Sequence, residues 1–407
     1  MRQELLHTIE LVAGGGVAAV LTFAFILVSG RMLGPAEYAD FSAALSFFYF
    51  VAVATSPLTP TTARLVTLYR LRGEADRVRA LQRAVLQRVL QWSAIAAAPI
   101  LIAVIPLARI FRFQSPMTIV LALCSASIFT TVSVQRGVLQ GLGRFREHVI
   151  NTIVEAALRL AGAVVVLYYL PSPTSALLAY LAALVIAELL LRRLLPSGEH
   201  SSAIDWTEVK ILAGPMLIAM LGVAVFQNAH VLAVKRWFAA SEAGYYGAAS
   251  SLASATSVLF VAVYTLSGPL LTDRHARGEA LLMPTLRLCG YFAALAAIPT
   301  LLFAYGANAV VAMVYGSAFH GAAVLLAALA GVPILTYLSL IIGQALITIG
   351  DRRFGWIYLG FAIVQIISFV IAHDTIRSII LSLYLVQGSL LFVMLLLLPR
   401  LRPRTLG

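Results

Sequence analysis

Two charged residues, Glu155 and Arg159, lie in an otherwise apolar stretch of the sequence. In a helix, residues four positions apart share a face, and an acid that precedes a base is the favourable order for an ion pair. A charge inside a membrane costs about 2.5–3.5 kcal/mol on insertion scales, so such residues face a partner or a polar cavity. Two interpretations stay open. The pair either fixes helix packing, or forms a site where Arg159 binds an anionic substrate and Glu155 takes up a coupling proton or sodium ion.

Other polar residues lie toward the ends of apolar stretches. Asn228 and His230 occur together, and His230 serves either as a hydrogen-bonding packing residue or as a titrating or phosphate-contacting group. Gln135, Arg136 and Gln344 are candidates for the inner mouth of a substrate cleft. Arg136 either meets a phosphate there or only sets the topology of the chain.

The composition defines an integral membrane protein. The chain is 61% hydrophobic and 11% charged, with a mean hydropathy of +0.94. Its apolar runs match the roughly 20 helical residues that cross a bilayer, and no alternating pattern of a membrane barrel occurs. We therefore expect an all-α polytopic protein with about twelve transmembrane helices, at 11–30, 42–62, 92–110, 117–134, 149–170, 174–191, 209–234, 244–270, 288–305, 322–347, 355–372 and 376–398.

The cations predict the orientation of these helices. Of the 29 Lys and Arg residues, 22 fall in the N-terminus, the even-numbered loops and the C-terminus, whereas six fall in the odd-numbered loops. Because cations near span ends are retained in the cytoplasm, both termini are expected there. The net charge of +12 has the same explanation, so nucleic acid is not expected as a partner.

Two sequence motifs occur twice in the same order. The first runs from Arg31 through Glu37 to Phe41 and recurs about 205 residues later, from Arg236 through Glu242 to Tyr246. The second recurs about 209 residues later, where Gln135-x5-Gly141-x2-Arg144-Phe145 is matched by Gln344-x5-Gly350-x2-Arg353-Phe354. Such repetition indicates duplication. We predict two six-helix bundles, residues 1–200 and 201–407, related by a pseudo-two-fold axis along the membrane normal, with a cleft between them.

Proline residues near the cytoplasmic ends of the second and eighth predicted spans are candidates for gating. They are Pro57, Pro60 and Pro269. Proline removes a backbone donor and bends a helix, and paired bends suit a cleft that opens alternately to either side.

The segment 63–91 carries seven arginines. Its apolar residues Val78, Leu81, Val85 and Val89 recur at helical spacing, which predicts a basic amphipathic helix on the inner membrane surface. Such a helix either anchors the topology on anionic lipid or forms a regulatory or partner site.

The first motif, Arg31-Met-Leu-Gly34-Pro35-Ala-Glu37-Tyr38 after a glycine-rich span, resembles the signature of bacterial polysaccharide-repeat-unit flippases. This is the Wzx-like branch of the multidrug/oligosaccharidyl-lipid/polysaccharide exporter superfamily. Gln140-Gly141-Leu-Gly-Arg144-Phe145 is also typical of the branch. Two features depart from it: Asn228 and His230 stand where an acid is common, and Ala39 stands where glycine is usual. The motif is either a duplicated structural hinge or a substrate contact.

The resemblance implies a translocase of the bacterial inner membrane that takes part in O-antigen or exopolysaccharide synthesis. It would flip an undecaprenyl-diphosphate-linked oligosaccharide by alternating access, coupled to protons or sodium ions and working with other polysaccharide assembly proteins. The alternatives are a cation-coupled multidrug exporter of the same superfamily and a membrane glycosyltransferase or polymerase. No nucleophile–base constellation, metal-ligand cluster or phosphate-binding glycine loop occurs in the sequence, so we expect no enzyme, cofactor or metal.

Overall fold

The computed structural model describes residues 2–195, 206–351 and 353–401. These residues form helices and connecting turns, and nine helical segments among them are long and apolar enough to cross a membrane. The first of these segments, Ala13–Leu71, has 59 residues and contains two of the predicted spans. The predicted all-α polytopic fold of two six-helix bundles is confirmed. The chain forms two compact units, Met1–Met220 and Leu221–Gly407, whereas the predicted boundary at residue 200 lies outside the described residues.

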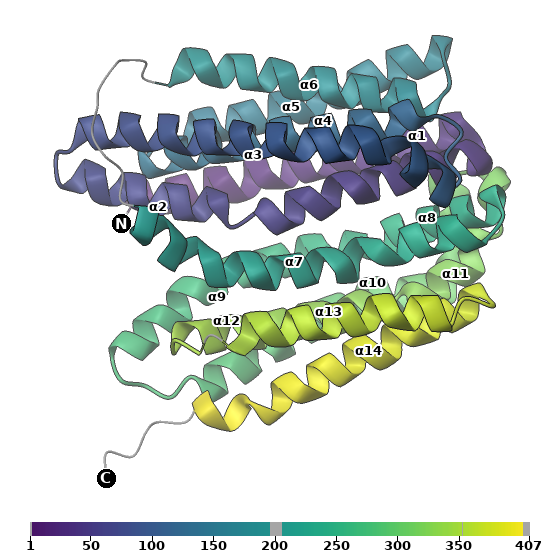
Figure 1. The fold of residues 1–407 in the computed structure, drawn as a ribbon. Helices are drawn as coiled ribbons and strands as arrows, with labels where there is room; N and C mark the ends of the chain where they lie inside the picture. Colours follow the sequence, from purple (N-terminus) through teal and green to yellow (C-terminus); the bar gives the residue numbers. More distant parts are fainter. Residues whose placement is uncertain (1, 196–205, 352, 402–407) are drawn as a thin grey trace. The chain divides into compact units, whose positions relative to one another are not determined.

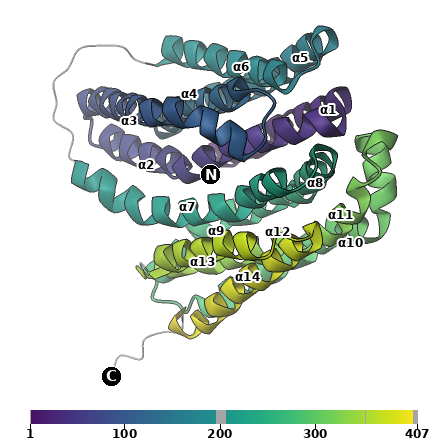
Figure 2. The same cartoon turned by 45° about the vertical axis from the view of Figure 1, so that its right-hand side comes forward.

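The first unit contains six spans built from α1 to α6, which run side by side in both views (Figure 1 and Figure 2). In this unit, α5 packs against α1 and α6, while α4 packs against α2, α3 and α6. The bounds are α1 (Arg2–Thr55), α2 (Leu58–Leu71), α3 (Ala75–Ile110), α4 (Pro116–Gly141), α5 (Phe145–Tyr169) and α6 (Pro173–Leu194).

The second unit begins within α7 and also contains six spans. Two of them are interrupted, one between α8 and α9 and one between α11 and α12. The bounds are α7 (Trp206–Trp237), α8 (Ala240–Ala253), α9 (Ser257–Ala276), α10 (Leu282–Val314), α11 (Ala322–Leu329), α12 (Val332–Thr348), α13 (Arg353–Ile371) and α14 (Ile376–Leu396).

The first motif forms a kink inside α1. Gly34 adopts φ 74° and ψ 171°, a conformation open to glycine but unfavourable for other residues, so the first two spans join without a loop. Just beyond the kink, Glu37 and Asp40 hold the turn between α3 and α4. Glu37 Oε1 accepts a hydrogen bond from Gln114 Nε2 at 3.0 Å, and Asp40 Oδ2 accepts one from the Gln114 backbone N–H at 2.8 Å. These contacts support the interpretation of the motif as a structural hinge.

The second copy of the motif also begins a helix. Glu242 lies in the first turn of α8, and its Oε2 accepts a hydrogen bond from the Ala239 backbone N–H at 3.3 Å. A free N–H at a helix start needs such an acceptor. The two glutamates thus make different contacts, Glu37 with the α3–α4 turn and Glu242 with the start of its own helix, while Arg31 and Arg236 lie before the break.

The gating prolines occupy different positions relative to the helix breaks. Pro57 lies at the break between α1 and α2, and Pro60 lies in the first turn of α2. In the second unit the corresponding span breaks at a 3₁₀ turn, Ser254–Thr256, whereas Pro269 lies inside α9. The eighth span is thus interrupted at a serine-rich segment rather than at its proline. A role for the prolines in gating stays a prediction.

The prediction of a surface helix over 63–91 is wrong. The segment is a hairpin in which α2 ends at Leu71 and α3 runs from Ala75 to Ile110 without interruption. Val78, Leu81 and Val85 are buried in a cluster with residues of α2, α4 and α6. The apolar stripe therefore packs against the bundle, and it cannot lie on lipid.

The second motif forms corresponding turns at one end of each unit. Arg144 Nη1 donates to the Leu194 carbonyl at 2.6 Å, which ties the α4–α5 turn to the end of α6. In the second unit Arg400 contacts Asp351 at 2.6 Å. Burial alone would raise the pKa of Asp351, but the Arg353 backbone N–H and the Arg400 guanidinium hold it below its usual value. The left-handed glycines of these turns are Gly143 and Gly350, so Gly141 and Gly350, which match in the sequence, are not equivalent in the structure.

Candidate functional site: a charged cluster in the first unit

The candidate site is built on one face of α5. Asn151, Glu155 and Arg159 follow one another at intervals of four residues, and all three are buried. Because this spacing nearly matches the helical repeat, the three side chains point to the same side of the helix. That side faces the interior of the first unit, where α1, α4 and α6 supply the partners.

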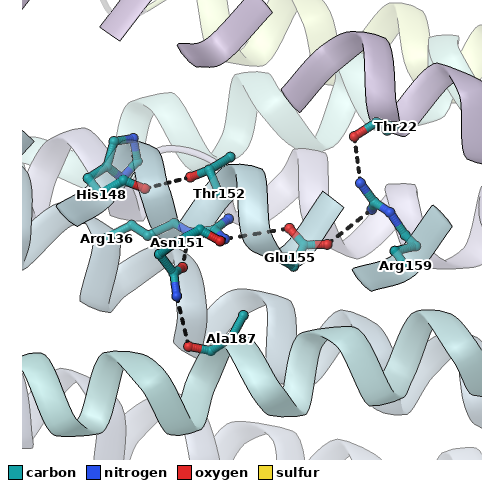
Figure 3. Close-up of polar contacts among 8 residues, drawn as sticks. All are labelled: Thr22, Arg136, His148, Asn151, Thr152, Glu155, Arg159 and Ala187. Carbon is teal, nitrogen blue, oxygen red and sulfur yellow. Dashed lines mark hydrogen bonds and ion pairs between the residues drawn. The ribbon is translucent and has the colours of Figure 1, made fainter. Parts of the chain in front are cut away.

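Two arginines share the Glu155 carboxylate (Figure 3). Arg159 Nη1 lies 3.3 Å from Glu155 Oε1, and Arg136 Nη2, from α4, lies 3.5 Å from Glu155 Oε2. All three side chains are at most 8% exposed. We call these three residues the charged cluster.

The remaining contacts of the cluster link four helices. Arg136 Nε donates to Asn151 Oδ1 at 2.9 Å, and Asn151 Nδ2 donates to the Ala187 carbonyl of α6 at 3.0 Å. At the other end, Arg159 donates a hydrogen bond to Thr22 of α1 (Figure 3). The positions of α1, α4, α5 and α6 therefore depend on one another through the cluster.

Aromatic rings cover the Arg159 guanidinium. Its central carbon lies 4.6 Å from the centre of the Tyr180 ring and 5.5 Å from that of Phe25. Cation–π contacts of this kind are strongest where water is excluded. Arg159 Nε has no hydrogen-bond partner, so the guanidinium keeps unused donor capacity beside the carboxylate.

The cluster carries more positive than negative charge. Two guanidinium groups surround one carboxylate in the interior of an apolar bundle. Buried charges are tolerated only when they are paired and hydrogen-bonded, and the second arginine exceeds what Glu155 can neutralise. The charged cluster therefore has a net positive charge.

Another buried carboxylate, Glu188 on α6, was not among the predicted site residues. Its Oε1 accepts hydrogen bonds from Gln135 Nε2 at 2.6 Å and from Arg192 Nε at 3.0 Å, and its Oε2 accepts one from Thr131 Oγ1 at 3.3 Å. The sequence contained the signal, because Glu188 lies in a predicted span four residues before Arg192, which is the same spacing that marked Glu155 and Arg159. Gln135 is therefore bound to Glu188, whereas its neighbour Arg136 belongs to the charged cluster.

Three predicted site residues belong to the second unit. Asn228 Nδ2 donates to the Ala224 carbonyl of its own helix at 2.9 Å. His230 Nδ1 lies 2.9 Å from the Tyr246 hydroxyl, and Gln344 Oε1 accepts a hydrogen bond from Tyr264 at 2.7 Å. These are neutral contacts of the kind that hold membrane helices together.

Asn151, Tyr180 and Thr22 were also missed. A lone Asn, Tyr or Thr in an apolar span has no pattern that separates a ligand of a buried charge from an ordinary packing residue. The helix packing alone identifies them.

Comparison with solved structures identifies the class of fold. A multidrug resistance MATE family transporter of the MOP superfamily, in its inward-facing conformation, matches with a TM-score of 0.78 at 14% identity, covering 95% of this chain and 96% of that one. The outward-facing conformation matches with a TM-score of 0.64 at 16% identity, covering 97% and 94%. The MATE multidrug transporter DinF-BH matches with a TM-score of 0.71 at 13% identity, covering 96% and 94%. The chain thus has the fold of the MATE transporters.

A family of sequences is identified as well. The model of the polysaccharide biosynthesis protein family matches residues 7–273, and the chain belongs to that family. The match includes the charged cluster, Glu188 and the first motif. No curated protein matches the sequence.

Removal of the shared carboxylate should destabilise the first unit. Glu155→Ala leaves Arg136 and Arg159 buried without a counterion, and breaking a buried pair typically costs about 3–5 kcal/mol. Thermal unfolding of the purified protein in detergent would measure the loss.

Glu147→Ala, on the same helix, is the matched control. Glu147 pairs with Arg144, and both side chains are 34% exposed. An exposed pair contributes about 1 kcal/mol or less, so this variant should unfold close to the wild-type temperature. Equal losses in the two variants would contradict the buried role of Glu155.

Proposed function

We propose that the protein flips a lipid-diphosphate-linked oligosaccharide, of the undecaprenyl type, across the bacterial inner membrane by alternating access. The observation that carries the proposal is the excess of positive charge in the charged cluster. Membership of the polysaccharide biosynthesis family supports an oligosaccharide as the substrate, and the MATE-like fold supports transport as the function. In this proposal both termini lie in the cytoplasm and other polysaccharide assembly proteins act as partners.

The chemistry of arginine suits a diphosphate. A phosphate that leaves water needs donors to replace its hydration shell, and the planar guanidinium group offers two parallel N–H donors to its oxygens. Arg159 has an unused Nε donor, and Arg136 lies on the other side of the same carboxylate. The two arginines are therefore the proposed ligands of the diphosphate.

Glu155 competes with the substrate for the same arginines. While it is ionised, Glu155 occupies the Arg159 and Arg136 guanidinium groups. Uptake of a proton, or binding of a sodium ion, weakens its attraction for them and frees donors for phosphate. In this mechanism Glu155 couples the ion gradient to substrate binding.

We propose that the polar residues of the second unit contact the neutral sugars of the substrate. Asn228, His230 and Gln344 offer amide and imidazole groups, which suit sugar hydroxyls better than phosphate. Pro57, Pro60 and Pro269 are proposed to let their helices bend during transport.

A cation-coupled multidrug exporter is the alternative function. Solved structures with this fold include multidrug transporters. A site for a cationic drug would need an excess of carboxylate, whereas the charged cluster has an excess of arginine. The charge balance therefore favours the flippase.

Replacement of Arg159 should stop polysaccharide export. In Arg159→Ala, Glu155 retains Arg136 as a counterion, so the protein is expected to accumulate normally while losing a phosphate ligand. Loss of a charge-assisted hydrogen bond costs about 1.5–3 kcal/mol, which predicts a fall in surface polysaccharide of about tenfold or more. A complementation assay in cells that depend on this chain, with protein levels measured in parallel, tests the proposal.

Arg159→Lys is the informative companion variant. It keeps the charge but loses the planar pair of donors, so it should restore export only in part. Normal polysaccharide with Arg159→Ala would remove Arg159 from the mechanism.

A second variant tests coupling. Glu155→Gln keeps a carbonyl oxygen for the two arginines but cannot bind or release a proton. Transport by this variant, measured in vesicles with and without an imposed proton or sodium gradient, should lose its response to the gradient. An unchanged response to both ions would exclude Glu155 as the coupling residue.

A further inference from the structure

The two units differ in the charge of one hairpin. The segment 63–91, which forms most of α2, the turn and the first part of α3, carries seven arginines against two acidic residues, Glu74 and Asp76. Glu74 pairs with Arg77 at 3.2 Å and Asp76 pairs with Arg79, so the two acids offset only part of the positive charge. The arginines are Arg64, Arg70, Arg72, Arg77, Arg79, Arg83 and Arg88.

The corresponding hairpin of the second unit, between α9 and α10, is nearly neutral. Its Arg277 pairs with Asp273 at 2.7 Å and its Arg274 pairs with Glu279 at 3.2 Å, which leaves Arg287 as the additional arginine of the segment 273–287. Since both hairpins join the same elements of the duplicated fold, the fold does not require the positive charge of the first. An anionic ligand at the first hairpin would account for the difference in charge between the two.

Along the exposed face of α3, the end at which the helix begins is basic, the middle is apolar, and Arg109 follows at the far end. Ile102, Ile95, Arg88 and Arg77 follow one another at intervals of seven, seven and eleven residues, which places them on one side of the helix. Ile102 is 79% exposed and Ile95 is 63% exposed, as expected for side chains that contact acyl chains. Trp92, at 65% exposed, lies between the isoleucines and the arginines.

This order matches the layers of a membrane leaflet. Aliphatic side chains suit the hydrocarbon, tryptophan prefers the interface, and arginine binds phosphate in the headgroup layer. An acidic protein would also attract arginine, but it would not explain the continuous run from isoleucine through tryptophan to arginine. The pattern therefore favours lipid over protein.

The basic face is held on a fixed helix. On the opposite side of α3, Val78, Leu81 and Val85 are 3%, 0% and 6% exposed and pack into the interior of the first unit. The arginines that share the exposed face are consequently presented at set positions, rather than on a flexible loop.

We propose that the exposed face of α3, with Trp92, Arg88 and Arg77 as its main contacts, binds the headgroups of anionic phospholipids. The lipids belong to the leaflet at the end of the first unit where α3 begins. Their negative phosphates pair with the arginines, and their acyl chains lie along Ile95 and Ile102. The site is independent of what the protein transports, so its test and that of the flippase can fail separately.

Lipid retention tests the site. The full-length protein is reconstituted in nanodiscs that contain equal amounts of phosphatidylcholine and phosphatidylglycerol, transferred to detergent, and analysed for retained lipid by native mass spectrometry. Wild type should retain phosphatidylglycerol in preference, and the Arg77→Gln/Arg88→Gln variant should lose this preference by about tenfold or more. Trp92→Ala should reduce retention of both lipids.

Arg274→Gln/Arg277→Gln is the matched control, because it removes the same charge from the corresponding hairpin of the second unit. It should keep the wild-type preference. The proposal is overturned if the Arg77/Arg88 variant keeps the wild-type ratio of the two lipids, which would point to an acidic protein as the ligand, or if both double variants lose the preference equally. The single variant Arg88→Gln repeats the test if the double variant does not fold.

Discussion

The first unit is constrained by charged side chains that are buried in an apolar bundle. A guanidinium or carboxylate that leaves water loses several kcal/mol of solvation, and only close pairing with full hydrogen bonding compensates. Arg136, Glu155 and Arg159 meet part of this demand with partners on α1, α4, α5 and α6, while Arg159 Nε has no hydrogen-bond partner. The packing of four helices therefore depends on one cluster. A change in the charge of Glu155 would alter the contacts of all four.

Comparison of the two units of the duplicated fold distinguishes the features that both share from those that occur in one unit. Both units have a motif glutamate at the start of a span and an arginine contact that fastens the turn after the fourth span. Among the described residues of the second unit, Lys235 at the end of α7 is the buried charged residue. The charged cluster is thus specific to the first unit, as expected if one unit binds the charged headgroup of the substrate and the other meets its neutral part.

Much of the fold could be predicted from the sequence, because the thickness of a bilayer sets the length of each span. The repeated motifs then divide the spans into two similar halves. The ion pair of Glu155 and Arg159 followed from helical spacing alone. The contact of Arg136 with Glu155 could not be predicted, because it depends on how α4 packs on α5. The surface helix over 63–91 was predicted wrongly, since an apolar stripe has the same spacing whether it faces lipid or protein. The helix break at Ser254–Thr256 was not predicted, because no proline marks it.

The proposed function requires that the protein moves a lipid-diphosphate oligosaccharide rather than a cationic drug. The most direct measurement uses proteoliposomes that contain the purified chain and a fluorescent oligosaccharide linked to undecaprenyl diphosphate, with flipping detected by an added enzyme that cleaves exposed sugar. Uptake of a fluorescent cationic dye is followed in parallel. The account predicts that the oligosaccharide crosses the bilayer and the dye does not. Dye transport with no movement of the oligosaccharide would contradict it.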